Sequence, residues 1–241
     1  MKFNQAKDLI ALNWRLYSGI SFGLGKNGVR ISRLYIIVPV LLGLVVAAYI
    51  VNNLTALFVI FLMSLFLLEM AKIAHKAGID PIHLFDLDIN YHQKIRNILL
   101  AELLGVKFMS LFLFGMVAWI GGYELIALPI LILLYGIFNV LFVLMWIIGN
   151  RIRTASIIYQ WMLIFLFTFL FGFSGLNLVQ TEEVHDLHLI IQDRIRVNFI
   201  VILSLLALSL IGLYYAGIFF TKSLYEKRPF INPESFPREM V

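Results

Sequence analysis

Long apolar stretches constrain this chain more than any other feature of its sequence. A helix of about 20 apolar residues crosses the roughly 30 Å core of a bilayer, at about 1.5 Å per residue. Because 61% of the residues are hydrophobic and only 14% are charged, a soluble surface is hard to build from them. We therefore expect an all-α, polytopic membrane protein, multi-pass in the plasma membrane of a bacterial cell. Six stretches are long enough to span: Leu34–Val51, Leu54–Ala74, Ile98–Ile120, Leu125–Ile148, Ala155–Phe173 and Asn198–Phe220.

The basic residues predict the orientation of these spans. Asn52 and Asn53 alone separate the first two stretches, and Gly121–Glu124 separates the third and fourth, so both pairs are expected to form antiparallel hairpins. With six spans, sixteen Lys and Arg residues fall on the side of the N-terminus and only Arg194 and Arg196 on the other. By the positive-inside rule, both termini are expected in the cytosol. The net charge of +5 then reflects the inner membrane face rather than nucleic acid.

The expected organisation has three parts. Residues 1–33 form a cytoplasmic amphipathic (elbow) helix and linker, and they lack the uninterrupted apolar core of a cleavable signal peptide. Residues 34–220 form the transmembrane domain, and residues 221–241 form a polar cytoplasmic tail. Apolar residues at helical spacing in Thr181–Arg196 predict an outer interfacial helix before the last span.

The cytoplasmic loop Lys72–Asn97 contains a segment of about the length of a short helix. Pro81 is favourable at the first position of a helix, and Asp80 before it is a suitable N-cap. We therefore expect a capped helix here.

A glycine-rich segment before the first span does not form a nucleotide site. Gly19–Lys26 ends in Gly-Lys, as a phosphate-binding loop does. That loop needs a glycine where this chain has Ile20, and Ser or Thr where it has Asn27. The chain is therefore not expected to hydrolyse ATP or to be an enzyme.

Charges inside the apolar stretches are candidate functional groups, because they are costly in lipid. Glu69, Glu102 and Lys107 are candidates for an intramembrane ion pair between helices. Alternatively, the Lys107 side chain extends to the inner membrane interface. On a straight helix, Glu102 and Lys107 would lie about 140° apart. They are therefore not expected to pair within one helix.

A metal site is a weaker possibility in the outer segment. His185 and His188 stand three residues apart beside Glu182, Glu183 and Asp186. They lack the i, i+4 histidine pair of zinc peptidases, so the polar face of an interfacial helix is the favoured interpretation. Cysteine is absent, which excludes disulfides and thiolate ligands.

The layout resembles that of the ABC-2-type transporter permeases. The local resemblance runs from Glu69 through Leu104, with Asp88 in place of the usual proline. It rests on a glycine, a Leu-rich stretch, a basic cluster and an apolar helix: Gly78, Leu84–Asn90, Lys94, Arg96 and Ile98–Leu104.

The resemblance implies a transport subunit that takes its energy from another polypeptide. Its partners would be nucleotide-binding ATPase subunits, which would hold ATP and Mg, a second permease copy or paralogue, and membrane lipid. The cargo would be amphipathic, a peptide or a lipid. The loop would contain the helix that docks on the ATPase, formed by Asp80, Pro81, Ile82, His83, Leu84, Phe85, Asp86, Leu87 and Asp88.

Other interpretations of the sequence stay open. The loop could be an ordinary capped connector without a partner. The chain could also be a secondary transporter or channel, a membrane-embedded enzyme, or a non-transporting assembly or immunity protein.

Overall fold

The computed structural model consists of helices joined by short turns in the part of the chain that it describes. It describes residues 34–51, 53–74, 91–151, 161–162, 164–166, 168–169, 172, 190–191 and 193–227. No strand occurs among these residues, so the predicted all-α class is confirmed for them. The helices with defined bounds are α2 (Leu34–Val51), α3 (Leu54–Ala74), α5 (Tyr91–Leu103), α6 (Lys107–Ile120), α7 (Glu124–Arg151) and α10 (Phe199–Lys227).

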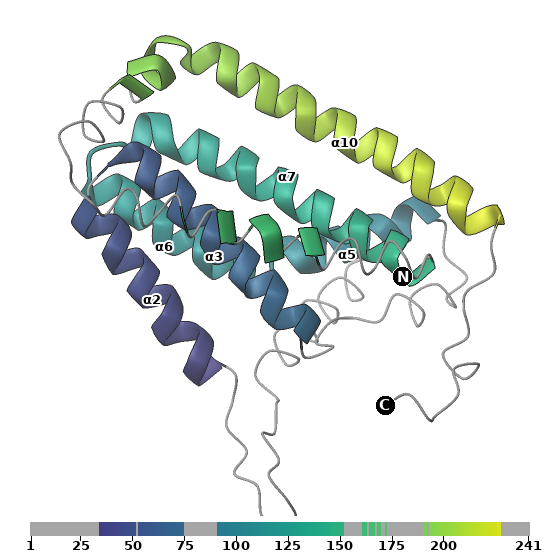
Figure 1. The fold of residues 1–241 in the computed structure, drawn as a ribbon. Helices are drawn as coiled ribbons and strands as arrows, with labels where there is room; N and C mark the ends of the chain where they lie inside the picture. Colours follow the sequence, from purple (N-terminus) through teal and green to yellow (C-terminus); the bar gives the residue numbers. More distant parts are fainter. Residues whose placement is uncertain are drawn as a thin grey trace, which may run out of the picture.

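Helices α2 and α3 form a hairpin with the bounds of the first two apolar stretches. The turn between them is closed by Asn53, whose side-chain oxygen accepts a hydrogen bond from the Thr55 amide at 2.8 Å. This asparagine therefore satisfies an amide at the start of α3 that has no partner within the helix. The two helices pack against each other (Figure 1).

Helices α6 and α7 form the second predicted hairpin. Gly122 has a φ of 73°, a conformation that glycine adopts without the steric cost of a Cβ. This turn lets the Tyr123 amide donate to the Ala118 carbonyl at 2.8 Å. The chain thus reverses within three residues, and α7 packs back along α6.

The buried side chains form two main hydrophobic clusters. The first, cluster A, joins α2, α3, α6 and the first half of α7, and it includes Leu57, Phe61, Phe114 and Leu131. The second, cluster B, joins α5, the second half of α7 and α10, and it includes Ile95. Helix α7 is therefore the only described helix that supplies buried residues to both clusters.

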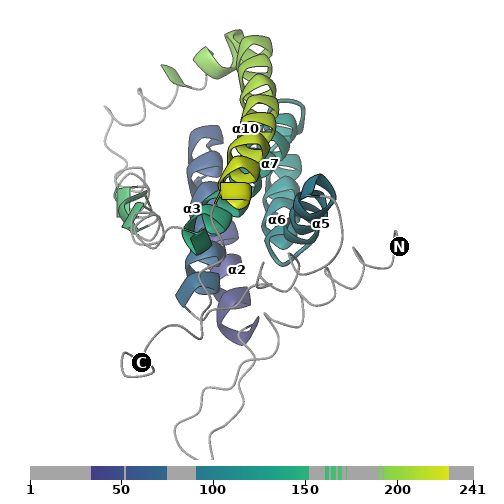
Figure 2. The ribbon, with the colours of Figure 1, turned by 90° about the vertical axis from the view of Figure 1, so that its right-hand side faces the viewer.

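Helix α10 lies along α7 on the outside of the bundle (Figures 1 and 2). It reaches cluster B through one strip of residues, Leu210, Leu213, Tyr214 and Ile218. Its other faces expose large apolar side chains: Val197 just before the helix, then Ile200, Val201, Leu205, Leu208, Ile211, Tyr215, Phe219 and Phe220. An apolar surface of this extent is typical of a helix that meets lipid or another protein.

Within the part of the chain that the structure describes, two helices are long and apolar enough to cross a membrane, over Leu125–Ile148 and Phe199–Ser223. The pair α5 and α6 counts as a third if its two bent halves make one span. Val38–Val51 and Leu54–Met70 are apolar but shorter within the residues searched. The fold is thus compatible with a membrane protein, with two spans or up to three among these helices.

The structure corrects two of the predicted bounds. The third stretch, expected as one helix over Ile98–Ile120, begins earlier at Tyr91 and breaks after Leu103. The last helix continues to Lys227, seven residues beyond its predicted end at Phe220. Hydropathy marks where a chain is apolar, whereas backbone hydrogen bonding continues through polar helix formers.

Several predicted features lie outside the described residues. These are the elbow helix of residues 1–33, the docking segment Asp80–Asp88, most of the fifth stretch and the tail beyond Lys227. Of the predicted outer helix, residues 190–191 and 193–196 are described, and they are helical.

Candidate functional site

The candidate site lies where one apolar stretch breaks into two helices. Helix α5 ends at Leu103, α6 begins at Lys107, and the two axes are bent by 49°. Hydrogen bonds between residues three apart replace the regular four-residue spacing here, from the Gly105 amide to the Glu102 carbonyl at 3.3 Å and from the Phe108 amide to the Gly105 carbonyl at 2.9 Å. A glycine at the centre of the break lowers the cost of leaving the helix.

Tyr135 on α7 stabilises the break from the side. Its hydroxyl donates to the Leu103 carbonyl oxygen at 2.7 Å. In a continuous helix that carbonyl would accept from the Lys107 amide. The tyrosine therefore supplies a partner to a backbone group that the break would otherwise leave without its helical one.

Three ionised side chains meet at the same point. The Lys107 ammonium lies 2.5 Å from a Glu69 carboxylate oxygen and 3.0 Å from a Glu102 carboxylate oxygen. Glu69 comes from α3, Glu102 from the last turn of α5, and Lys107 from the first turn of α6. Their residue exposures are 0%, 5% and 1%, so the ion cluster is buried inside the bundle.

The break explains how Glu102 and Lys107 pair. A straight helix would separate them by about 140°, and on that basis they were not expected to pair within one helix. That expectation assumed a continuous third helix, whereas the structure places Glu102 on α5 and Lys107 on α6, so the pair joins two helices. The bend turns the first residue of α6 back toward the last turn of α5.

Aromatic rings cover the apolar side of the ion cluster. The Lys107 ammonium lies 5.0 Å from the centroid of the Phe142 ring on α7, within the range of a cation–π contact. Phe142 in turn packs edge-on against Phe66 of α3, with ring centroids 5.6 Å apart. Residues of α3, α5, α6 and α7 therefore enclose the three charges together.

Burial makes this ion cluster energetically demanding. Removing one partner of a buried ion pair typically costs about 3–5 kcal/mol, because a charge is then left without compensation. Replacing the whole set by apolar residues is often neutral. The cluster links α3, α5 and α6 through Lys107, and we expect it to add little net stability.

The other predicted site residues lie outside the described part of the chain. These are the docking segment Asp80–Asp88 and the weak metal candidates His185 and His188. Tyr135 and Phe142 are site residues that the sequence did not single out. The only signal for Tyr135 was a polar hydroxyl within an apolar stretch, which ordinarily needs a buried hydrogen-bond partner.

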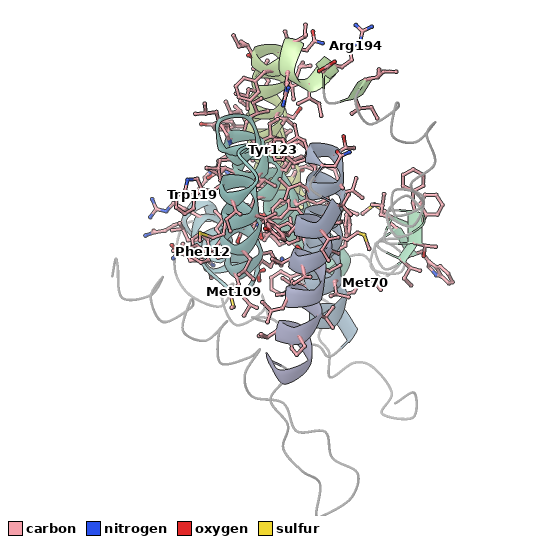
Figure 3. The ribbon with its side chains drawn as sticks, turned by 90° about the vertical axis from the view of Figure 1, so that its left-hand side faces the viewer. Met70, Met109, Phe112, Trp119, Tyr123 and Arg194 are labelled. Carbon is pink, nitrogen blue, oxygen red and sulfur yellow. The ribbon has the colours of Figure 1, made fainter. Side chains whose placement is uncertain are left out.

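The outer face of α6 is turned away from the site. Figure 3 shows Phe112 and Trp119 on the outer side of α6, where both side chains are exposed. Only one side of α6 therefore carries the buried polar and apolar contacts.

Comparison with known proteins gives no relative with which this site can be compared. No protein-family model, curated protein or solved structure matches the chain.

Proposed function

We propose that this chain is the transmembrane permease subunit of an ATP-driven, ABC-type exporter. The observation that supports the proposal is that α3 and α5, the two helices connected by residues 75–90, are joined through one buried ion cluster. This segment leaves α3 after Ala74 and enters α5 at Tyr91, and both helices meet at the buried ion cluster. A partner that pushes on this loop would act on two helices that are already joined inside the bundle.

The outer surface of the bundle supports a membrane location. Helix α10 exposes apolar side chains around most of its circumference, which would be unfavourable in water and is favourable in lipid. We include in the proposal the six spans, both termini in the cytosol, and a position in the plasma membrane. The strong excess of basic residues on one side supports that orientation.

The first half of α5 supports a position at the membrane surface. It begins with the polar sequence Tyr-His-Gln-Lys before the apolar residues of its second half. Such a helix suits a segment that passes from the cytosolic interface into the bilayer. The loop before it would then face the cytosol, where an ATPase can dock.

Energy is proposed to come from a separate polypeptide. The glycine-rich segment that ends at Lys26 lacks the residues of a phosphate-binding loop. Two ATPase subunits and two permease copies, identical or paralogous, would form the working exporter. The apolar, aromatic character of the helices favours an amphipathic, peptide or lipidic cargo over a hydrated ion.

Substitutions in the loop test the proposal. Asp86→Lys with Asp88→Lys, or Leu84→Arg with Phe85→Arg, should abolish co-purification with a nucleotide-binding ATPase subunit and leave membrane insertion intact. The matched control is Glu234→Lys with Glu239→Lys, which makes the same charge change in the tail. If the loop variants still retain the ATPase and support export, the loop is not the docking site.

A secondary transporter is the second candidate, and the buried ion cluster is what favours it. Ionisable residues inside membrane helices often mark ion or proton pathways, and broken helices often form such sites. Asn139 and Ser110 add buried polar groups on α7 and α6. Purified chain alone in proteoliposomes decides between the two: uptake driven by an ion gradient, without ATPase, would favour this candidate.

A further inference from the structure

The break at residues 104–106 separates the two hydrophobic clusters of the bundle. Buried residues of α5, such as Ile95 and Ile98, belong to cluster B with α10. Buried residues of α6, such as Phe114 and Val117, belong to cluster A with α2 and α3. The chain thus passes from one packing unit to the other at the point where its helix bends by 49°.

The ion cluster is the polar connection across that boundary. Lys107 begins α6 and contacts Glu69 of α3, on the side of cluster A. The same ammonium contacts Glu102 of α5, on the side of cluster B. One side chain therefore holds both units at the break.

The loop of residues 75–90 ends on both sides of this connection. Glu69 stands five residues before the end of α3, and α5 starts at the other end of the loop. A displacement of the cytosolic end of α3 moves Glu69, and Glu69 moves Lys107. Because buried charges require close partners, Lys107 cannot follow one carboxylate far without losing the other.

We propose that Lys107 is a positioning residue that latches α5 against α3 and α6, and that it transmits movement of the loop to the α5–α6 angle. The break is the hinge, and the ion cluster sets its resting angle. The resting latch follows from the described contacts alone. Its role during ATP-driven transport rests on the proposed function.

The size of the movement is set by the length of α5. At about 1.5 Å per residue, its 13 residues make a lever of about 20 Å. A rotation of about 20° about the break would therefore move the first turn of α5 by about 7 Å. A shift of that size would loosen the packing of the first turn of α5 in cluster B, where α5 contacts α10.

Two spin labels measure this movement in the full chain. The sequence contains no cysteine, so His92→Cys on α5 and Phe219→Cys on α10 provide the only labelling sites. Both positions are exposed, and they flank cluster B from α5 and α10. Pulsed electron paramagnetic resonance in nanodiscs then gives the distribution of their separation.

If the ion cluster holds α5 in place at rest, the label separation should have a narrow distribution in the wild-type chain. Lys107→Met should broaden it and shift its mean outward by several ångströms, on the order of the 7 Å lever movement. Arg194→Met is the matched control, because it removes an exposed positive charge outside the ion cluster and should leave the distribution unchanged. An unchanged distribution in Lys107→Met would overturn the latch.

Two further variants test the same inference if Lys107→Met does not insert into the membrane. Glu102→Gln keeps the side-chain size and removes one charge, so it should broaden the distribution less. Glu69→Lys with Glu102→Lys and Lys107→Glu reverses all three charges and restores both pairings, so it should narrow the distribution again. A reversed triple variant as broad as Glu102→Gln would show that pairing does not set the angle.

Measurements with the ATPase bound distinguish a failure of this inference from a failure of the proposed function. With the ATPase bound, ATP should shift the label separation in the wild type, whereas Lys107→Met should retain the ATPase but lose the shift. If no ATPase binds the wild type, the proposed function fails while the resting measurement still judges the latch. If Lys107→Met shows the full ATP-driven shift, the transmitting role fails and the proposed function stands.

Discussion

Helices α7 and α10 have similar lengths and apolar composition, yet they occupy different environments. In its most apolar 18-residue stretch, half of the residues of α7 are buried, while none of those of α10 are. Helix α7 contributes to both hydrophobic clusters and covers the ion cluster through Phe142. Helix α10 touches the bundle mainly along one strip. Hydropathy therefore identifies helices that suit a membrane, but it does not tell a central helix from a peripheral one.

The largest difference in stability is expected between alanine substitutions of a buried phenylalanine on α7 and an exposed one on α10. Phe142→Ala on α7 removes a ring that is 1% exposed and in contact with Phe66 and Lys107. The loss should be about 3–5 kcal/mol, because a cavity forms beside a buried charge. Phe219→Ala on α10, where the ring is 78% exposed, should change stability by less than about 1 kcal/mol. Thermal unfolding in detergent compares them, and equal losses would contradict the central role of α7.

Two glycines of α10 offer an intermediate test. A Cβ at Gly217 would overlap Leu144 Cδ1 of α7, whereas one at Gly212 would meet nothing within 4 Å. Gly217→Val should therefore loosen the α7–α10 contact at a cost of about 1–3 kcal/mol. Gly212→Val should be close to neutral. Disulfide cross-linking between cysteines introduced on α7 and α10 reports the contact. If Gly212→Val lowered the cross-linking yield more than Gly217→Val, the Gly212 face would have a partner that the structure does not contain.

The smallest effect is expected from single hydroxyl groups. Tyr135→Phe on α7 removes the donor to the Leu103 carbonyl at the helix break and should cost about 1 kcal/mol. Tyr215→Phe on α10 removes a hydroxyl from a side chain that is 69% exposed, and no measurable change is expected. Hydrogen exchange of the amides of residues 104–109 is the sensitive measurement. Unaltered exchange in Tyr135→Phe would show that the break does not depend on this bond.

The apolar pattern predicted the helical hairpins well, because their turns carry strong local signals. Asn53 before α3 and the Gly121–Gly122 pair before α7 both act within a few residues of themselves. The bounds of α2 and α3 followed directly from where the apolar stretches end.

The break between α5 and α6 was not predicted, because its cause is not local. Leu104-Gly105-Val106 contains no proline, and a single glycine is tolerated within many helices. The geometry depends on Glu69 and Tyr135, which come from other helices. One signal did exist: opposite charges five residues apart in an apolar stretch each need a buried partner, and a bend provides one. The sequence also could not predict that α10 lies at the edge of the bundle, because lipid and protein interiors favour the same side chains.

The single strip of contact between α10 and the bundle also bears on the order of assembly during synthesis. Helices that cross a membrane form individually and associate afterwards. Cluster A draws its buried residues from α2, α3, α6 and α7, all of which precede α10 in the chain. That cluster can therefore be completed before α10 has left the ribosome. The last helix would then dock on a finished surface of α7, as a late and separable step of assembly.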